Sequence, residues 1–74
     1  MAHGMNAARL FDYLINRFDL KNDRGLAHAL EESPSNISRA RAGKIAFGDT
    51  RILDVHEVFE VPIKEIKELL KNET

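Results

Sequence analysis

The sequence predicts an all-α fold of five short helices packed as one compact domain. Apolar residues recur at helical spacing in five separate segments, and no stretch shows the alternation of a β-strand. The connectors between these segments are short and contain residues typical of helix caps and turns. The chain has 74 residues, which is enough for one domain and too few for two.

The composition also indicates domain limits and location. Residues 1–4 (Met-Ala-His-Gly) are interpreted as a remnant of an expression vector, because a second methionine follows at position 5. The domain is expected to span residues 5–71, with a frayed tail at 72–74. The chain has no cysteine and no apolar run that approaches the ~18 residues of a membrane span, so we expect a cytoplasmic protein.

The first helix is expected to begin at Asn6 or a neighbouring residue and to run for about three turns. Asn22 is expected to cap the second helix, since an asparagine side chain accepts a bond from a free N–H group of the first turn. Gly25, in that first turn, permits another backbone to come close.

The stretch Leu26–Lys44 is central to the fold. It contains two short apolar-periodic segments separated by a polar break at residues 31–34. Ser33 is a good N-cap, and Pro34 suits the first position of a helix because its missing N–H group costs nothing there. Gly43 is a natural stop, since it can take the left-handed conformation. Two short helices joined by a tight turn form a helix-turn-helix, here at about residues 23–42.

The loop after Gly43 carries two apolar anchors, Ile45 and Phe47. Asp49 or Thr50 is expected to cap a fourth helix, and Pro62 separates it from a fifth. The apolar faces of the helices predict a core that consists of Leu10, Phe11, Leu14, Phe18, Leu20, Leu26, Ala27, Leu30, Ile37, Ala40, Ile52, Val55, Phe59, Val61, Ile63, Ile66 and Leu70.

Charge is distributed unevenly along the chain. The formal net charge is −1, yet residues 33–51 carry four basic side chains and one acidic one, whereas residues 52–74 carry six acidic and three basic ones. A local basic patch is the electrostatic feature that favours binding of a polyanion. The alternative is that a chain with 31% charged residues forms such a patch by chance.

No catalytic or metal site is expected. No glycine-rich phosphate loop and no nucleophile with a paired base appears, so we expect neither enzyme activity nor a cofactor. His28 has Glu31 and Glu32 at i+3 and i+4, but no second histidine or cysteine lies in register.

Several short motifs match a known pattern over residues 20–71. They are Leu26-Ala27 with Leu30, Ser33-Pro34-Ser35, Ile37-Ser38-Arg39, Gly43-Lys44 and Val61-Pro62-Ile63-Lys64-Glu65-Ile66. With these motifs the chain resembles the lambda-repressor-like (Cro/XRE-type) helix-turn-helix family of phage repressors, Cro proteins and small bacterial regulators. The resemblance implies a sequence-specific DNA-binding transcriptional regulator, a repressor of phage, prophage or bacterial origin, located in the bacterial or phage-infected cytoplasm.

Four residues depart from that family pattern. Glu31 stands where the family usually has glycine in the turn, and Glu32 stands where an apolar residue is usual. Arg41 replaces a usual acidic residue, and Asp23 replaces a frequent glutamine. Glu31, Glu32 and Asp23 place negative charge near the expected DNA face, whereas Arg41 adds positive charge. The alternative is that Glu31 and Glu32 point away from this face or pair with Arg24 or Arg39.

The resemblance also implies a set of DNA contacts. The helix at residues 34–42 would enter the major groove. Ser35, Asn36 and Arg39 are expected to project from one exposed side and contact bases. The group that Gly25 allows to come close would then be either the backbone of the first helix or a DNA phosphate. Phosphate contacts are expected from Asn22, Ser38, Arg41, Lys44 and Arg51. Alternatively, Ser35 and Asn36 serve only as capping residues and Arg39 is simply solvated.

A domain this small is expected to bind a palindromic operator as a homodimer. The expected dimer surface is the fifth helix with the end of the fourth: Val58, Ile63, Leu69 and Leu70. The alternative is that these four residues complete the core of one copy. A second hypothesis for function, motivated by Glu31, Glu32 and the acidic last third, is a protein-interaction module of antitoxin-like or antirepressor-like type, with weak or no DNA binding.

Overall fold

The computed structural model describes residues 7–71, which form five α-helices and no β-strand. The expectation of an all-α fold is confirmed. The predictions for residues 1–6 and 72–74 lie outside the described residues. No helix within residues 7–71 is long and apolar enough to cross a membrane. The helices are α1 (Ala8–Phe18), α2 (Asp23–Leu30), α3 (Pro34–Arg41), α4 (Asp49–Phe59) and α5 (Ile63–Leu70).

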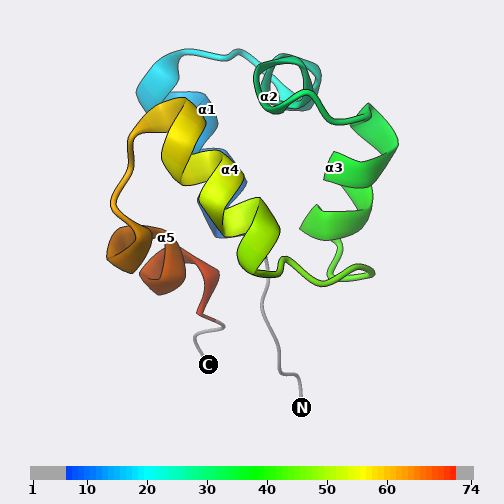
Figure 1. Cartoon of the computed structure of the whole chain (residues 1–74). Coiled ribbons are helices and arrows are strands. Elements are labelled where there is room, and N and C mark those ends of the chain that lie inside the picture. The colour runs from blue at the N-terminus through cyan, green and yellow to red at the C-terminus, as the bar shows by residue number, and fades with distance from the viewer. Residues whose placement is uncertain (1–6, 72–74) are drawn as a thin grey trace.

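The helices pack around a shared core, and in the view of Figure 1 α4 lies in front of α1. Helix α5 packs against α1 and α4, and α2 packs against α1, α3 and α4. Helix α3 packs only against α2 and α1, and it lies on the opposite side of α4 from α5 (Figure 1). Helix α3 therefore sits at the edge of the domain, where much of its surface is open.

The core follows the predicted apolar faces, with one addition from the loop before α4. Phe11 is fully buried, and its ring meets the ring of Phe47 edge to face at 5.7 Å. Phe47, which the sequence marked only as a loop anchor, is thus part of the core, as is Ala7. Five residues expected in the core lie instead at its half-buried rim: Phe18, Leu20, Leu30, Phe59 and Ile63.

The predicted caps of α2 and α3 are present. The side-chain oxygen of Asn22 accepts the N–H group of Gly25 at 3.0 Å, and Ser33 Oγ accepts the N–H group of Asn36 at 3.2 Å. The expectation for α4 is wrong, because Asp49 already lies inside the helix and Gly48 takes the capping position without a side-chain bond. The Asp49 carboxylate then lies in the first turn, where the helix dipole favours a negative charge.

The connector between α1 and α2 explains Gly25. The Leu20 carbonyl accepts the N–H group of Asn22 at 2.9 Å across Lys21, which has a positive φ of 77°, so the chain makes a very tight turn. A Cβ atom on Gly25 would lie 2.1 Å from the same Leu20 oxygen. The backbone that approaches Gly25 is therefore the α1–α2 connector of the chain itself.

Candidate nucleic-acid interface

The turn between α2 and α3 places the two glutamates in different roles. Glu31 takes the left-handed conformation (φ 58°) that ends α2, and its N–H group bonds to the carbonyl of His28. The next N–H group, that of Glu32, reaches back to the Ala27 carbonyl at 2.9 Å. This pair of bonds is a Schellman motif, and the left-handed position in it is the one that most favours glycine. Helix α3 ends with the same pair of bonds and has Gly43 at this position.

Glu32 turns inward and joins α3 to α4. Its Oε1 accepts a bond from Asn36 Nδ2 at 3.1 Å, and its Oε2 pairs with Arg51 Nη1 at 3.1 Å. Asn36 and Arg51 are consequently half-buried. The expectation that Asn36 projects with Ser35 and Arg39 is therefore corrected: Asn36 is half-buried and its side chain is bonded to Glu32. Arg51, expected at a DNA phosphate, already has a carboxylate partner.

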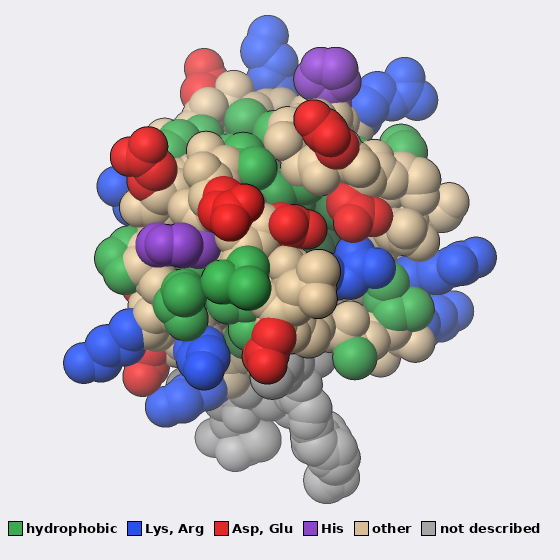
Figure 2. Space-filling model, in the orientation of Figure 1, with side chains coloured by type: hydrophobic (Ala, Val, Ile, Leu, Met, Phe, Trp, Pro, Cys, Tyr) green, Lys and Arg blue, Asp and Glu red, His purple; other side chains and the backbone are tan. Residues whose placement is uncertain are grey.

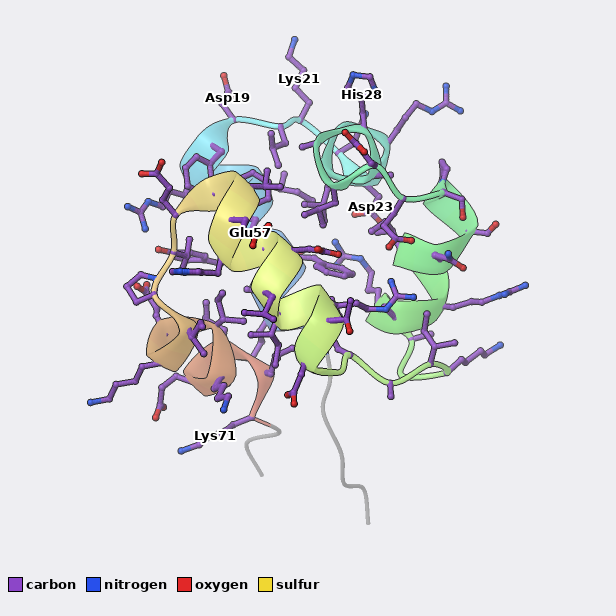
Figure 3. The ribbon with its side chains drawn as sticks, viewed as in Figure 1. Asp19, Lys21, Asp23, His28, Glu57 and Lys71 are labelled. Carbon is purple, nitrogen blue, oxygen red and sulfur yellow. The ribbon has the colours of Figure 1, made fainter. Side chains whose placement is uncertain are left out.

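Arg41 is held even more tightly. Its Nη2 and Nε bond to the two carboxylate oxygens of Asp23 at 2.7 and 3.2 Å, and its Nη1 bonds to Asp12 at 2.8 Å. The guanidinium also lies over the ring of Phe11, 5.8 Å from its centre. The hydrogen bond to Asp23 raises the pKa of Arg41, against the opposing effect of partial burial. Figure 3 shows Asp23 between α2 and α3, so this group links α1, α2 and α3 and is not available to a phosphate.

Two departures from the family pattern thus explain each other. Asp23 and Arg41 are a bidentate pair, so the acidic residue at the start of α2 and the basic residue at the end of α3 neutralise one another. The sequence pattern alone does not pair them. The signal that could have linked them is that two unexpected residues of opposite charge fall on helices that the fold packs together.

The outer side of α3, which carries Ser35, Ser38 and Arg39, is not bonded to the other described residues in this way. Ser35, Ser38 and Arg39 are exposed, and exposed Lys44 follows in the next loop. Within the part of the chain that the structure describes, Arg39 and Lys44 make neither an ion pair nor a side-chain hydrogen bond. Figure 2 shows several Lys and Arg side chains that project outward from the side of the molecule where α3 lies. These side chains can meet a polyanion without first breaking an internal contact.

The start of α2 is largely committed to the fold. Asn22 is exposed, but its side-chain oxygen holds the N–H group of Gly25 as the helix cap. Nearby, Lys21 and His28 point away from the body of the protein (Figure 3). A contact from Asn22 to a phosphate would therefore use groups other than this oxygen.

Acidic residues flank α3 on its α4 side. A groove of about 330 Å³ between the end of α2 and α4 is lined by polar and apolar side chains. Figure 2 shows acidic side chains gathered over this region. The lining residues include Glu31, Asp54 and Glu57, which make no ion pair among residues 7–71, and Val58, which is 48% exposed. The negative potential of this flank disfavours the approach of a polyanion.

The residues expected at a dimer surface are divided by the structure. Leu70 is buried at 1% exposure and belongs to the core, so its assignment to the dimer surface is corrected. Ile63 and Leu69 are half-buried and pack against the core. Of the four, Val58 alone is exposed, and it lies in the acidic groove.

Among residues 7–71 no group of three or more His, Cys, Asp or Glu side chains is placed to hold a metal ion. Comparison of the chain with protein-family models, with curated proteins and with solved structures finds no match.

Proposed function

We propose that this protein is a sequence-specific DNA-binding regulator in which α2 and α3 act as a lambda-repressor-like helix-turn-helix. The observation that carries the proposal is the outer side of α3: Ser35, Ser38 and Arg39 are exposed there, and Arg39 has no partner within the described chain. A helix at the edge of a domain that presents such a side suits insertion into the major groove.

The contacts divide by the chemistry of each side chain. Arg39 is the candidate for a bidentate contact to guanine, because its two outer nitrogens match the O6 and N7 acceptors. Ser35 and Ser38 are short donors and acceptors for base edges, phosphates or bridging waters. Lys44, one loop further on, is placed for a phosphate. Asn36 has a supporting role without a base contact, since its amide is bonded to Glu32 and helps to fix the first turn of α3.

The electrostatic part of the binding is expected to be small. Arg41 and Arg51 are neutralised inside the protein, so few cations beside α3 remain for phosphates. With Arg39 and Lys44 as the two cations of this side that are unpaired within the described chain, each displacing about one counterion, the slope of log K against log salt should be near −2 per copy. Such a weak non-specific contribution makes affinity depend on two copies that read two half-sites about 34–36 Å apart.

Selection of bound duplexes from a randomised pool at low salt tests the proposal, with the mass of each complex measured on the same sample. We expect an enriched motif with two-fold symmetry and two chains per duplex. Lys44→Ala should weaken binding to all duplexes and flatten the salt slope by about one. Lys64→Ala removes another exposed lysine, on α5, and should change neither. A pool that shows no enriched motif would contradict the proposal.

One observation favours the protein-interaction module as a second candidate. Helix α4 carries the two exposed large hydrophobic residues of the described chain, Leu53 and Val58, and Val58 lies beside unpaired carboxylates. Such a surface suits a basic partner with an apolar residue. Absence of an enriched DNA motif, together with saturable binding of an Arg- and Leu-rich peptide that Glu57→Gln weakens, would favour this function.

A further inference from the structure

An open groove between α4 and α5 has a second kind of surface. It has a volume of about 250 Å³ and is lined by Asp49, Ile52, Leu53, Ile63 and Lys67. Ile52 is buried and forms its floor, whereas Leu53 is 47% exposed. Figure 2 shows hydrophobic side chains gathered over α4 and α5, next to acidic and basic ones. An exposed leucine above an apolar floor is a surface that gains free energy when it is covered.

The two charged residues of this groove lie on different helices. Asp49 is in the first turn of α4 and Lys67 is in the second half of α5. Both are exposed, and neither makes an ion pair with any residue of the described chain. The groove therefore carries one free negative and one free positive charge on opposite rims. This distribution is complementary to an inverted copy of itself.

We propose that this groove is the face through which two copies of the chain associate about a two-fold axis. In such an isologous contact each residue pair occurs twice. Asp49 of one copy meets Lys67 of the second copy, and Lys67 of the first meets Asp49 of the second. The two Leu53 side chains pack across the axis onto the apolar floor beside Ile63.

The other exposed flank of α4 does not suit the same partner. Around Val58 the unpaired charges of the groove are all negative: Glu31, Asp54 and Glu57. Two copies placed there would bring like charges together, which costs free energy. Charge thus favours the Leu53 side of α4 for a second copy. The proposed dimer surface therefore differs from the one expected from the sequence: it includes Asp49, Leu53 and Lys67 and leaves out Val58 and Leu70.

The proposed contact is compatible with the outer side of α3. Helices α3 and α5 lie on opposite sides of α4 and do not pack against each other (Figure 1). A second copy seated between α4 and α5 leaves Ser35 and Arg39 uncovered. The inference rests on the proposed function only for the use of the dimer on two half-sites, and the dimer itself is measured without DNA.

The first test is sedimentation equilibrium over a range of concentrations, with Leu53→Lys and Val58→Lys as matched variants. Both residues are about half exposed on the same helix, so neither change removes a core contact. We expect the wild-type mass to rise toward that of a dimer with concentration. Leu53→Lys should raise the dimer dissociation constant by about tenfold or more, and Val58→Lys should leave it unchanged.

The second test separates contacts between copies from contacts within one copy. Asp49→Lys places two lysines at each proposed pair, and Lys67→Asp places two aspartates, so each variant alone should be monomeric. A mixture of the two variants restores an opposite-charge pair at both positions, and native mass measurement should show the mixed dimer. Circular dichroism of each variant checks its fold, because a lysine in the first turn of α4 opposes the helix dipole.

The outcomes are distinguishable from those for DNA binding. A wild-type chain that stays monomeric at all concentrations, equal effects of Leu53→Lys and Val58→Lys, or a mixture without mixed dimers would overturn the inference. A wild-type dimer that yields no enriched duplex would contradict the proposed function and leave this interface standing. If the chain stays monomeric and still selects a motif, the interface is overturned and the proposed DNA binding stands.

Discussion

Arg39 and Arg41 are two positions apart on the same helix, but only one of them is paired within the described chain. Arg41 points inward and binds Asp23 and Asp12, whereas Arg39 points outward and has no partner among residues 7–71. The same division applies to the neighbouring polar residues, since Asn36 is bonded to Glu32 while Ser35 and Ser38 are exposed. The charge that a segment can offer to DNA is therefore the charge left after internal pairing, not the number of basic residues in its sequence.

Gly25→Ala tests the packed region most severely. The new Cβ atom would meet the Leu20 carbonyl oxygen at 2.1 Å, and a backbone atom cannot move aside cheaply. We expect a loss of roughly 3 kcal/mol in the free energy of unfolding, although alanine is the better helix former. Urea denaturation measures it. Gly48→Ala is the control, because its Cβ would meet nothing within 4 Å, and it should stay within about 0.5 kcal/mol of wild type.

Arg41→Ala should produce the next largest effect. It leaves two carboxylates unpaired and uncovers Phe11, and because Arg41 is partly exposed we expect a loss of about 1.5 kcal/mol in stability. Arg39→Ala should cost less than about 0.5 kcal/mol. Thermal or urea unfolding of both variants measures the contrast. Equal losses would mean that Arg39 is also a structural residue.

The raised pKa of Arg41 gives this contrast a pH signature. A group whose pKa is higher in the folded state stabilises fully below its unfolded pKa, and this contribution is lost only as pH rises through the folded pKa. For an arginine both lie at strongly alkaline pH. The stability difference between wild type and Arg41→Ala should therefore be flat from about pH 6 to about pH 9. A steep change in that range would mean that another titrating group, and not Arg41, causes the stability difference between the two proteins.

Glu31→Gly should stabilise the protein by about 1 kcal/mol, because it relieves a left-handed residue that carries a side chain. Glu31→Ala removes the same carboxylate but keeps the strain, so it should change stability by only a few tenths of a kcal/mol. Differential scanning calorimetry compares the two. If both variants gain equally, the charge of Glu31 and not its backbone conformation is the unfavourable feature.

Glu32→Gln is expected to cost only about 0.5–1 kcal/mol in stability, since the Glu32–Arg51 pair is partly exposed. A double-mutant cycle with Arg51→Gln isolates the pair, and its coupling energy should account for most of the loss. A coupling energy of zero would mean that Arg51 is free, and it would then return to the set of phosphate-contact candidates.

The sequence predicted what depends on near neighbours. The Asn22 and Ser33 caps and the left-handed Gly43 need only residues within one turn, and the structure has all three. The bond between Asn36 and Glu32 could not be predicted from neighbouring residues. Glu32 is also paired with Arg51, and only the packing of α4 brings Arg51 to this place. The partners of Arg41 lie 18 and 29 positions away. Leu53 is exposed because it falls beside the face formed by Ile52 and Val55.

Titration of the selected duplex with wild type, Arg39→Ala and Arg41→Ala, at a temperature where all three are folded, tests the division of α3 most directly. The proposed function predicts that Arg39→Ala loses about 1–3 kcal/mol of binding and relaxes specificity at one base pair. Arg41→Ala, corrected for its folded fraction, should bind within about threefold of wild type. The contrary result, normal binding by Arg39→Ala and lost binding by a folded Arg41→Ala, would contradict the assignment of the outer side of α3 to DNA.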